Sequence, residues 1–333
     1  MPSSKETIQS PKKQNLFYLF VLLWVVFWVS VWFFFGKSST KQIISWFLYT
    51  NPVLDYDVSS SIMDNKNLNL EQDLQEYLEA KKWKNKTTHI SVYFRNLNNW
   101  NRFGINEKEE FSPASLMKLP LLISYYKLSQ EYPNLLKEKL LYIPDPIEQE
   151  ITQNVKPEKT LKPYQEYTIK DLLDRMILYS DNKSSVLLEN TIDFELYKKS
   201  FTDIGISFPE FKNGMFENNI NIVEYASFFR VLYNASYLNR SNSEYILDLL
   251  SNTTFVRWLN KGVPNNIVVS HKFWERVIGW EKQLHDCWIV YYPNHPYILC
   301  VMTRGWDWEM LENIITDVSR KIYSEVDLQY NKK

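Results

Sequence analysis

The sequence contains few glycines, cysteines and histidines, the residue types that characterise collagen-like chains and zinc sites. Only 7 residues are glycine and 2 are cysteine, and the 4 histidines are scattered. So few glycines exclude a collagen-like chain, and without a Cys-x-x-Cys motif a zinc site has no support. The net charge of −1 gives no reason to expect a nucleic acid partner. We therefore expect neither a metal nor another cofactor.

Aromatic residues, in contrast, are abundant, with 22 Tyr, 19 Phe and 12 Trp. This profile is typical of a helix-rich globular protein with a substantial core. The chain contains no internal repeat and no low-complexity domain. Beyond its N-terminal region it is long enough for one large domain or for two interleaved subdomains.

Residues 16–35 form an apolar run in which Ser30 is the only small polar residue. At the rise of a helix this run is long enough to cross the hydrocarbon core of a bilayer. Gly36-Lys37 offers a poor cleavage site, so we expect an uncleaved transmembrane anchor rather than a signal peptide. We predict a cytoplasmic tail at 1–15 and a tether at 36–68, because the latter shows no sustained periodicity.

The stretch from Phe111 to Pro120 ends a polar turn and opens an apolar helix predicted to run from Ser115 to about Leu128. Ser115 and Lys118 are one turn apart and therefore share a face. A hydroxyl at a helix N-terminus lies near backbone N–H groups that can stabilise an oxyanion, and a lysine beside it can take its proton. Ser115 is thus the candidate nucleophile.

Ser-x-x-Lys alone is weak evidence, because the chain contains it five times, at Ser10, Ser38, Ser115, Ser124 and Ser180. Ser115 differs in being followed at a distance by Ser180-Asp181-Asn182 and then by His271-Lys272. The order and spacing of these motifs resemble the penicillin-recognising serine hydrolases, the superfamily of class A β-lactamases and penicillin-binding proteins. The resemblance covers a predicted domain at 69–326, followed by a short tail at 327–333.

The resemblance implies an α+β, three-layer fold, in which helices and a helical subdomain flank an antiparallel β-sheet. The predicted order agrees with this expectation, because a helix capped by Asn69 precedes strands at 89–95 and 102–106 and then the Ser115 helix. The remaining predicted elements are helices at 169–178 (capped by Thr168), 184–189, 194–201, 222–233, 245–250 (with a Ser241–Glu244 capping box) and 311–323, and strands at 267–272, 287–292 and 297–304.

The resemblance also implies roles for the motif residues. Ser115 would attack a carbonyl group to form an acyl-enzyme, with Lys118 as its general base. Burial and the nearby cation Lys272 would each lower the pKa of Lys118. Ser180 would relay a proton to the leaving nitrogen, and the side-chain amide of Asn182 would hold the acyl amide of the substrate.

Lys272 would anchor the carboxylate of the substrate and polarise the relay hydroxyl. The backbone N–H groups of Ser115 and Glu275 would form the oxyanion hole. Asp181 is expected to point away and brace its loop. His271 would face the side of its strand opposite to Lys272, so we interpret it as a packing residue.

The third motif departs from the family pattern, because Lys272-Phe273-Trp274 replaces the usual Lys-Thr-Gly. Phe273 removes a hydroxyl that helps to hold the substrate carboxylate. Trp274 puts an indole where a bare backbone usually lets the substrate approach. An indole along the strand edge would narrow the groove and slow acylation by bulky β-lactams.

The deacylating glutamate of class A enzymes has no clear counterpart. Glu217 and Asn221 have the family spacing, but Glu217 lies too close to the helix that begins near Ile222. Glu210 is better placed but lacks the asparagine. Both glutamates can equally be exposed loop acids.

Cys287 and Cys300 lie on two strands that we expect to be joined by the four residues 293–296. Counting back from such a loop puts Cys300 opposite Ile289, so the two thiols would be diagonal neighbours at best. The sequence therefore predicts two buried free cysteines rather than a disulfide.

The resulting hypothesis is a membrane-anchored, monomeric serine hydrolase that acts on a β-lactam or a related amide through an acyl-enzyme on Ser115.

 The anchor would bind membrane lipid, with the N-terminus inside and the catalytic domain outside the cytoplasmic membrane, where this superfamily works. Two alternatives stay open: a D-Ala-D-Ala carboxypeptidase or transpeptidase acting on peptidoglycan peptides, and a degenerate, non-catalytic protein that binds peptidoglycan.

Overall fold

The computed structural model describes residues 48–51, 68–84, 87–99, 101–144, 157–209, 211–212, 215–216, 220–254 and 261–331. The chain divides into two units, Met1–Trp46 and Phe47–Lys333, and only the second contains described residues. The predicted anchor at 16–35 and both candidate deacylating glutamates, Glu210 and Glu217, lie outside the described residues. Within the described part, no helix combines the length and the apolar character that a membrane span requires.

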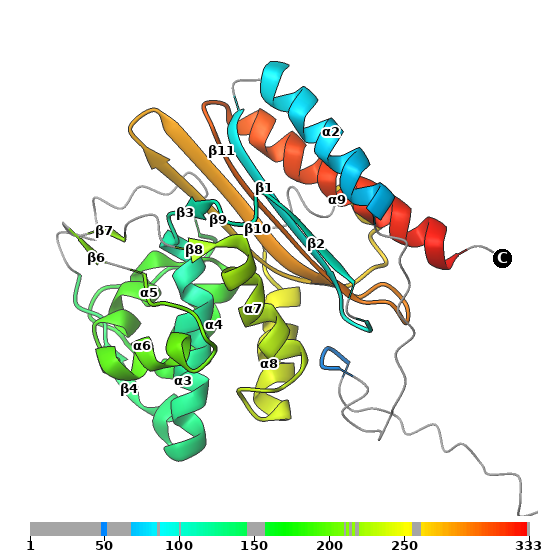
Figure 1. Cartoon of the computed structure of the whole chain (residues 1–333). Helices are drawn as coiled ribbons and strands as arrows, with labels where there is room; N and C mark the ends of the chain where they lie inside the picture. The colour runs from blue at the N-terminus through cyan, green and yellow to red at the C-terminus, as the bar shows by residue number, and fades with distance from the viewer. Residues whose placement is uncertain are drawn as a thin grey trace, which may run out of the picture. The chain divides into compact units, whose positions relative to one another are not determined.

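The centre of the described unit is a five-stranded antiparallel sheet in the order β2-β1-β11-β10-β9 (Figure 1). Its strands are rich in β-branched and aromatic residues, which fit a pleated, buried surface. Strand β1 pairs with both β2 and β11, so segments from the two ends of the domain lie side by side. The strands are β1 (Thr87–Asn96), β2 (Arg102–Ile105), β9 (Val269–Ile278), β10 (Glu281–Val290) and β11 (Tyr297–Gly305).

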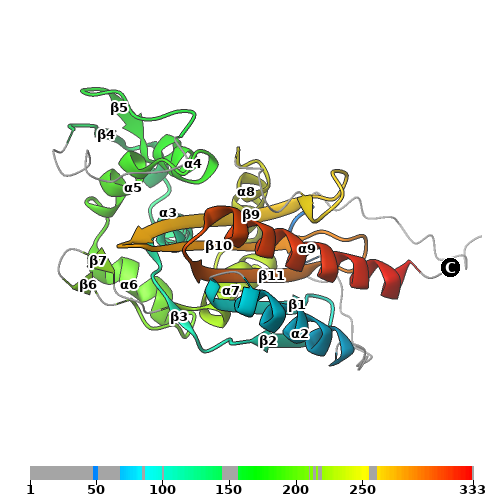
Figure 2. The ribbon, with the colours of Figure 1, turned by 90° about the horizontal axis from the view of Figure 1, so that it is seen from above.

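Helices cover both faces of this sheet, which confirms the predicted layers. Figure 2 shows α2 (Leu68–Lys84) and α9 (Trp308–Tyr330) across one face. Their apolar side chains join those of that sheet face, such as Trp288, in one buried cluster. The other face packs against α7 (Ile222–Tyr233) and contributes Trp274 to a second cluster, which belongs to the helical subdomain.

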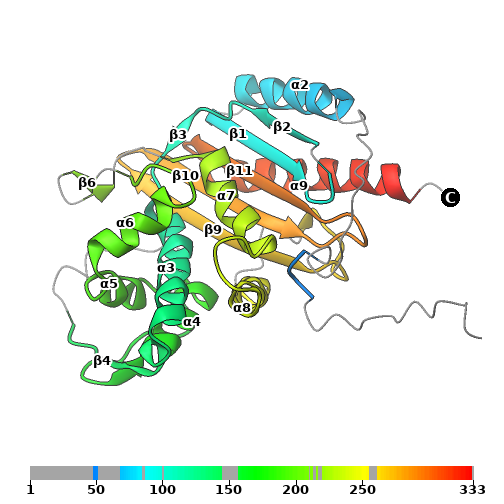
Figure 3. The ribbon, with the colours of Figure 1, turned by 60° about the horizontal axis from the view of Figure 1, so that its bottom comes forward.

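The helical subdomain is built around α3, which contacts α4 and α6 (Figure 3). Its helical segments are η2 (Ala114–Met117), α3 (Lys118–Glu131), η3 (Leu135–Lys137), α4 (Ile169–Leu178), α5 (Asn182–Glu189), α6 (Phe194–Thr202) and α8 (Arg240–Ser251). Short strand pairs join its loops: β3 (Glu110–Phe111) with β8 (Ile220–Asn221), β4 (Lys139–Leu141) with β5 (Glu166–Thr168), and β6 (Phe211–Lys212) with β7 (Met215–Phe216).

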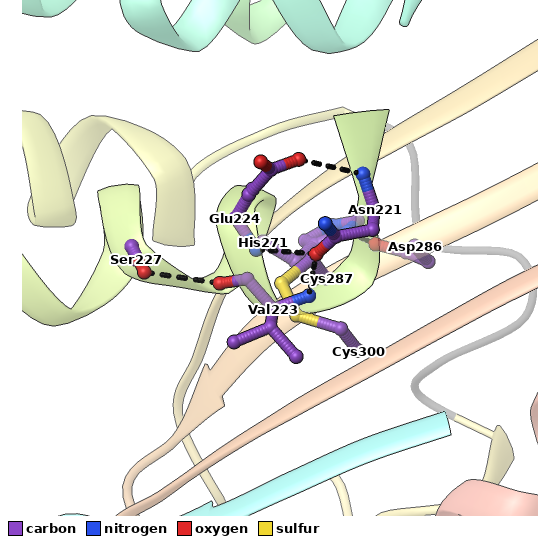
Figure 4. Close-up of a disulfide and its surroundings, with 8 residues drawn as sticks. All are labelled: Asn221, Val223, Glu224, Ser227, His271, Asp286, Cys287 and Cys300. Carbon is purple, nitrogen blue, oxygen red and sulfur yellow. Dashed lines mark hydrogen bonds and ion pairs between the residues drawn. A yellow bond between two sulfur atoms is a disulfide. The ribbon is translucent and has the colours of Figure 1, made fainter. Parts of the chain in front are cut away.

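Side-chain caps fix where several of these helices begin. Thr168 caps α4 as predicted, and its Oγ1 accepts a hydrogen bond from the N–H of Asp171 at 3.1 Å. Asn221 and Glu224 form a reciprocal capping box at the start of α7, with both bonds 3.0 Å long (Figure 4). Each cap satisfies backbone N–H groups that the first turn leaves without an intrahelical partner.

The predicted capping box of Ser241 and Glu244 is wrong. Helix α8 begins earlier, at Arg240, and its N-cap is Asn239. The Glu244 carboxylate instead accepts the backbone N–H groups of residues 48–50, with bonds of 2.8 Å from Tyr49 and Thr50. The local spacing predicted that this carboxylate would cap the helix. It binds instead a segment that is far away in the sequence.

Described residues outside the predicted domain pack against it at both ends. Residues 48–51, which fall in the predicted tether, dock on the domain, and the N–H of Asn51 donates to the carbonyl of Tyr233 at 2.7 Å. At the other end, α9 continues into the predicted tail at 327–333. Its last residue, Tyr330, stacks on His295 with 3.5 Å between the ring centres.

The prediction of free cysteines is also wrong, because Cys287 and Cys300 lie directly opposite each other and form a disulfide (Figure 4). The connection between β10 and β11 spans residues 291–296 and is longer than the assumed four-residue loop. Its two ends pair with other segments, since the N–H of Tyr291 donates to Val268 and the carbonyl of Pro296 accepts from Leu97. Those bonds set the register that brings the two thiols together.

Candidate active site

Ser115 lies in the 3₁₀ turn η2 and Lys118 is the first residue of α3, so the helix predicted to begin at Ser115 is divided into two segments. Ser115 is partly exposed, whereas Lys118 is buried with 2% of its surface exposed. The backbone N–H of Lys118 bonds to the carbonyl of Ser115, which fixes the turn between them. The 3₁₀ turn that carries Ser115 packs against strand β9. The candidate nucleophile therefore lies between the helical subdomain and β9, the strand at the edge of the sheet.

The ammonium group of Lys118 reaches the loop between α4 and α5. Its Nζ donates to the backbone carbonyl of Ser180 at 2.7 Å, to Asn182 Oδ1 at 2.6 Å and to Ser180 Oγ at 3.3 Å. Ser180 has a positive φ of 54°, which is uncommon for a residue other than glycine or asparagine. In this left-handed conformation, both the carbonyl oxygen and the hydroxyl oxygen of Ser180 accept hydrogen bonds from Lys118.

Asp181 braces the same loop and is not bonded to either lysine. Its carboxylate caps α5 by accepting the N–H of Ser184 at 3.2 Å and the hydroxyl of Ser184 at 2.6 Å. A third bond, 2.8 Å long, comes from the hydroxyl of Thr160. These three hydrogen bonds hold Asp181 in place. They thereby orient Ser180 and Asn182 toward Lys118.

Lys272 approaches the loop from strand β9 and is buried, with 1% of its surface exposed. Its Nζ donates to Ser180 Oγ and to the carbonyl of Phe273, both at 3.1 Å. The ammonium group also lies 4.6 Å from the centre of the Phe273 ring. The hydroxyl of Ser180 is thus within hydrogen-bond distance of two lysines from different parts of the chain.

Burial lowers the pKa of both lysines, and Lys118 loses its proton more readily than Lys272. Burial is the main cause that lowers the pKa of Lys118 well below its ordinary value, and the positive charge of Lys272 lowers it further. Burial also lowers the pKa of Lys272 to about 8, against the opposing effect of Asp286. A lysine must lose its proton before it can act as a base, so the site provides what Lys118 needs.

The register of the sheet determines where the N–H of Glu275 points. Residues of β9 bond to β10 alternately, and the bond from Tyr291 N–H to the carbonyl of Val268 shows that Val268 bonds toward β10. Glu275 is an odd number of positions from Val268, so its N–H points away from β10. Strand β9 lies at the edge of the sheet and packs against the turn of Ser115. The arrangement is compatible with the predicted oxyanion hole.

The expectation that Trp274 lines the groove is wrong. Its indole is buried, with 1% of its surface exposed, and lies against His285 with 4.3 Å between the ring centres. Because side chains alternate along a strand, Phe273 points to the opposite face, where it is also buried. Both aromatic residues of the altered third motif therefore serve as core residues.

Replacing Trp274 with glycine should lower the free energy of unfolding by about 3–5 kcal/mol, because it leaves a large cavity in the core. Trp280 is the matched control, since 92% of its surface is exposed. Its replacement by glycine should change the unfolding free energy by less than about 0.5 kcal/mol. Urea denaturation of both variants measures the difference, and equal losses would contradict the core role of Trp274.

His271 lies on the face of β9 opposite to Lys272, as expected for a packing residue. Its Nδ1 is 3.3 Å from Asp286 Oδ1 and its Nε2 is 2.8 Å from the hydroxyl of Thr253. Among the described residues, no group of three His, Cys, Asp or Glu side chains is arranged to hold a metal ion.

The sequence reasoning missed one acidic residue of the site, Glu189. It lies at the end of α5, accepts a hydrogen bond of 2.9 Å from the hydroxyl of Ser185, and interacts electrostatically with Lys118. The signal was present, because Asn182, Ser185 and Glu189 follow one another at helical spacing.

Comparisons with known proteins agree with this geometry. The family model described as the beta-lactamase enzyme family matches residues 69–326. No curated protein sequence matches the chain.

Solved structures of similar fold include PBP-A, with a TM-score of 0.66 and 22% identity over 78% of this chain and 97% of that one. A mutant of PBP-A was solved as an acyl-enzyme complex with penicillin G. A β-lactamase from Chitinophaga pinensis has a TM-score of 0.64 and 16% identity over 78% and 99% of the two chains. A class A β-lactamase from Mycobacterium abscessus has a TM-score of 0.62 and 16% identity, over 76% and 99%.

The matched region contains the turn of Ser115, the Ser180 loop and strand β9, and it makes up most of the chain. The chain therefore belongs to the beta-lactamase enzyme family, whose members are serine hydrolases that act on amide bonds.

Proposed function

We propose that this protein forms an acyl-enzyme on Ser115 with a β-lactam or a related amide. The observation that carries the proposal is the hydroxyl of Ser180, which lies within hydrogen-bond distance of both Lys118 and Lys272. A hydroxyl between two buried lysines can pass a proton from one group to another. The neutral state favoured for Lys118 supports its part as the base.

In the proposed reaction, Lys118 takes the proton of Ser115 while Oγ bonds to the carbonyl carbon of the substrate. The N–H groups of Ser115 and Glu275 stabilise the oxyanion that results. When the carbon–nitrogen bond breaks, the proton passes from Lys118 through the hydroxyl of Ser180 to the leaving nitrogen. Lys272 attracts a carboxylate on the substrate. Each proton removed is thus returned, and the product is an ester on Ser115.

Covalent labelling tests this proposal. Wild-type protein incubated with a fluorescent penicillin should carry one label, and mass spectrometry of its peptides should locate that label on Ser115. Heat-denatured protein is the control for non-specific reaction. A label on another residue, or none at all, would contradict the proposal. The absence of a label together with binding to peptidoglycan would favour the non-catalytic alternative.

A second candidate is a D-Ala-D-Ala carboxypeptidase or transpeptidase that acts on peptidoglycan peptides. It is favoured by the sequence, in which the deacylating glutamate of class A enzymes has no clear counterpart. Turnover separates the two candidates. Rapid release of hydrolysed penicillin would favour a β-lactamase, whereas an acyl-enzyme that persists for hours would favour the cell-wall enzyme.

We also propose that residues 16–35 anchor the protein in the cytoplasmic membrane, with the N-terminus inside, the catalytic domain outside and the protein monomeric. The apolar run supports this proposal. The full chain should stay with membranes during alkaline carbonate extraction. A truncated chain that begins at Phe47, and so keeps the docked residues 48–51, should be released. Release of the full chain would contradict the anchor.

A further inference from the structure

Helices α3 and α5 are joined by hydrogen bonds near both ends of α5. At the first end, Lys118 Nζ donates to Asn182 Oδ1 at 2.6 Å. At the other end, the hydroxyl of Tyr125 donates to the backbone carbonyl of Leu188 at 2.8 Å. Lys118 and Tyr125 are two turns apart on α3, and Asn182 and Leu188 are nearly two turns apart on α5. These two bonds connect the first half of α3 to both ends of α5.

Glu189 lies on the face of α5 that Asn182 turns toward α3, because residues seven positions apart share a helix face. The hydroxyl of Ser185 donates to Glu189 Oε1 at 2.9 Å. Ser185 is one turn nearer to the start of α5, so the Glu189 side chain points back along the helix, toward the end at which Lys118 is bound. The carboxylate therefore lies toward the end of α5 at which Lys118 is bound.

A third helix, α6, contributes to the same region. The hydroxyl of Tyr197 donates to the backbone carbonyl of Met117, next to Lys118, at 3.0 Å. Glu189 acts electrostatically on Tyr125 and Tyr197 as well as on Lys118. Lys118 is the basic group of this set, and the tyrosines are neutral at physiological pH.

Lys118 faces charged groups from three elements. Burial and Lys272 on β9 lower its pKa, whereas Asp181 in the loop and, to a smaller extent, Glu189 on α5 raise it. Asp181 already accepts three hydrogen bonds, from Ser184 and Thr160. Glu189 has one hydrogen bond to a described side chain, from Ser185, and its own pKa is raised by burial. Of the two acids, Glu189 therefore has fewer hydrogen bonds that stabilise its negative charge.

We propose that Glu189 is a positioning residue for acylation, whose carboxylate contributes to the protonation of Lys118 and thereby shifts the pH range in which Ser115 is activated. This inference rests on the proposed function. When Lys118 takes the proton of Ser115 it becomes an ammonium ion, and the Glu189 carboxylate stabilises that charge. The lysine then passes the same proton to the leaving nitrogen through Ser180, so Glu189 itself gains and loses no proton.

The pH profile of acylation tests the inference. The rate constant for labelling by a fluorescent penicillin should rise with pH as Lys118 loses its proton. Glu189→Gln removes a negative charge near Lys118, so the pKa of the lysine falls and the rise should move about one unit toward lower pH. Ser185→Ala removes a bond that stabilises the carboxylate, so it should give a smaller shift in the same direction.

Glu195→Gln is the matched control, because it removes the same charge at an exposed position on α6. Its profile should coincide with that of the wild type. A Glu189→Gln variant that folds, acylates and keeps the wild-type profile would overturn the inference. If that variant does not fold, an unshifted profile for Ser185→Ala would overturn it instead.

A measurement without substrate separates this inference from the proposed function. Carbon-13 NMR of labelled lysines follows the titration of Lys118, whose signal is identified by its loss in Lys118→Met. Glu189→Gln should move this titration toward lower pH even if no penicillin reacts with the wild type. Failure of labelling alone would thus reject the proposed function, and an unchanged titration would reject the role of Glu189.

Discussion

Replacing Ser115 with alanine should abolish covalent labelling by a fluorescent penicillin and leave the thermal midpoint close to that of the wild type. Alanine has no oxygen that can attack a carbonyl group. Ser115 is partly exposed, and no hydrogen bond joins its hydroxyl to another residue of the part that the structure describes. Loss of this hydroxyl therefore leaves no buried group unsatisfied, and the stability should change by less than about 0.5 kcal/mol.

Ser124 provides a matched control on the same helix, because it begins another Ser-x-x-Lys sequence. Its hydroxyl is buried and lies within hydrogen-bond distance of the carbonyl of Pro120, at 2.8 Å, and of the hydroxyl of Ser200, at 2.7 Å. Ser124→Ala should keep full labelling. Equal labelling of the wild type and Ser115→Ala would show that Ser115 is not the nucleophile.

Replacing Lys118 with methionine should slow acylation by about 10²–10⁴-fold, the usual contribution of a general base. Methionine has a similar length but cannot accept the serine proton. The wild-type rate should rise with pH because the neutral lysine is the active form, and the variant should lose this rise. Stopped-flow labelling across a range of pH measures both effects.

Lys118→Arg separates the charge of the side chain from its basicity. Arginine keeps a cation that can donate to Ser180 and Asn182, but it does not lose its proton in this pH range. We expect it to lose as much rate as Lys118→Met. An arginine variant that acylates within tenfold of the wild type would exclude Lys118 as the base.

Much of the fold follows from local patterns in the sequence. Apolar residues at helical spacing predicted α7 with its bounds as observed, and alternation predicted β1 and β2. The failures arose where a distant segment competed for a local group. Glu244 binds the N–H groups of residues 48–50 rather than capping α8, because the docked segment offers several donors to one carboxylate.

The candidate site was likewise predicted only in part from the sequence. Motif spacing identified Lys118, Ser180 and Lys272, which the structure brings together. It did not reveal Glu189, because the importance of this residue depends on how α5 is joined to α3. It also misplaced Trp274, since the face on which a side chain lies says nothing of how deep it is buried.

The left-handed backbone at Ser180 has a consequence for engineering this protein. Glycine or asparagine adopts such a φ at lower cost, so either replacement relieves strain of about 1 kcal/mol. A selection for heat resistance alone would therefore favour the loss of serine at this position. The same change removes the hydroxyl that lies between the two lysines. At this residue, a gain in thermal stability would be accompanied by the loss of the hydroxyl that the proposed reaction needs. Heat-resistant variants must therefore also be screened for acylation.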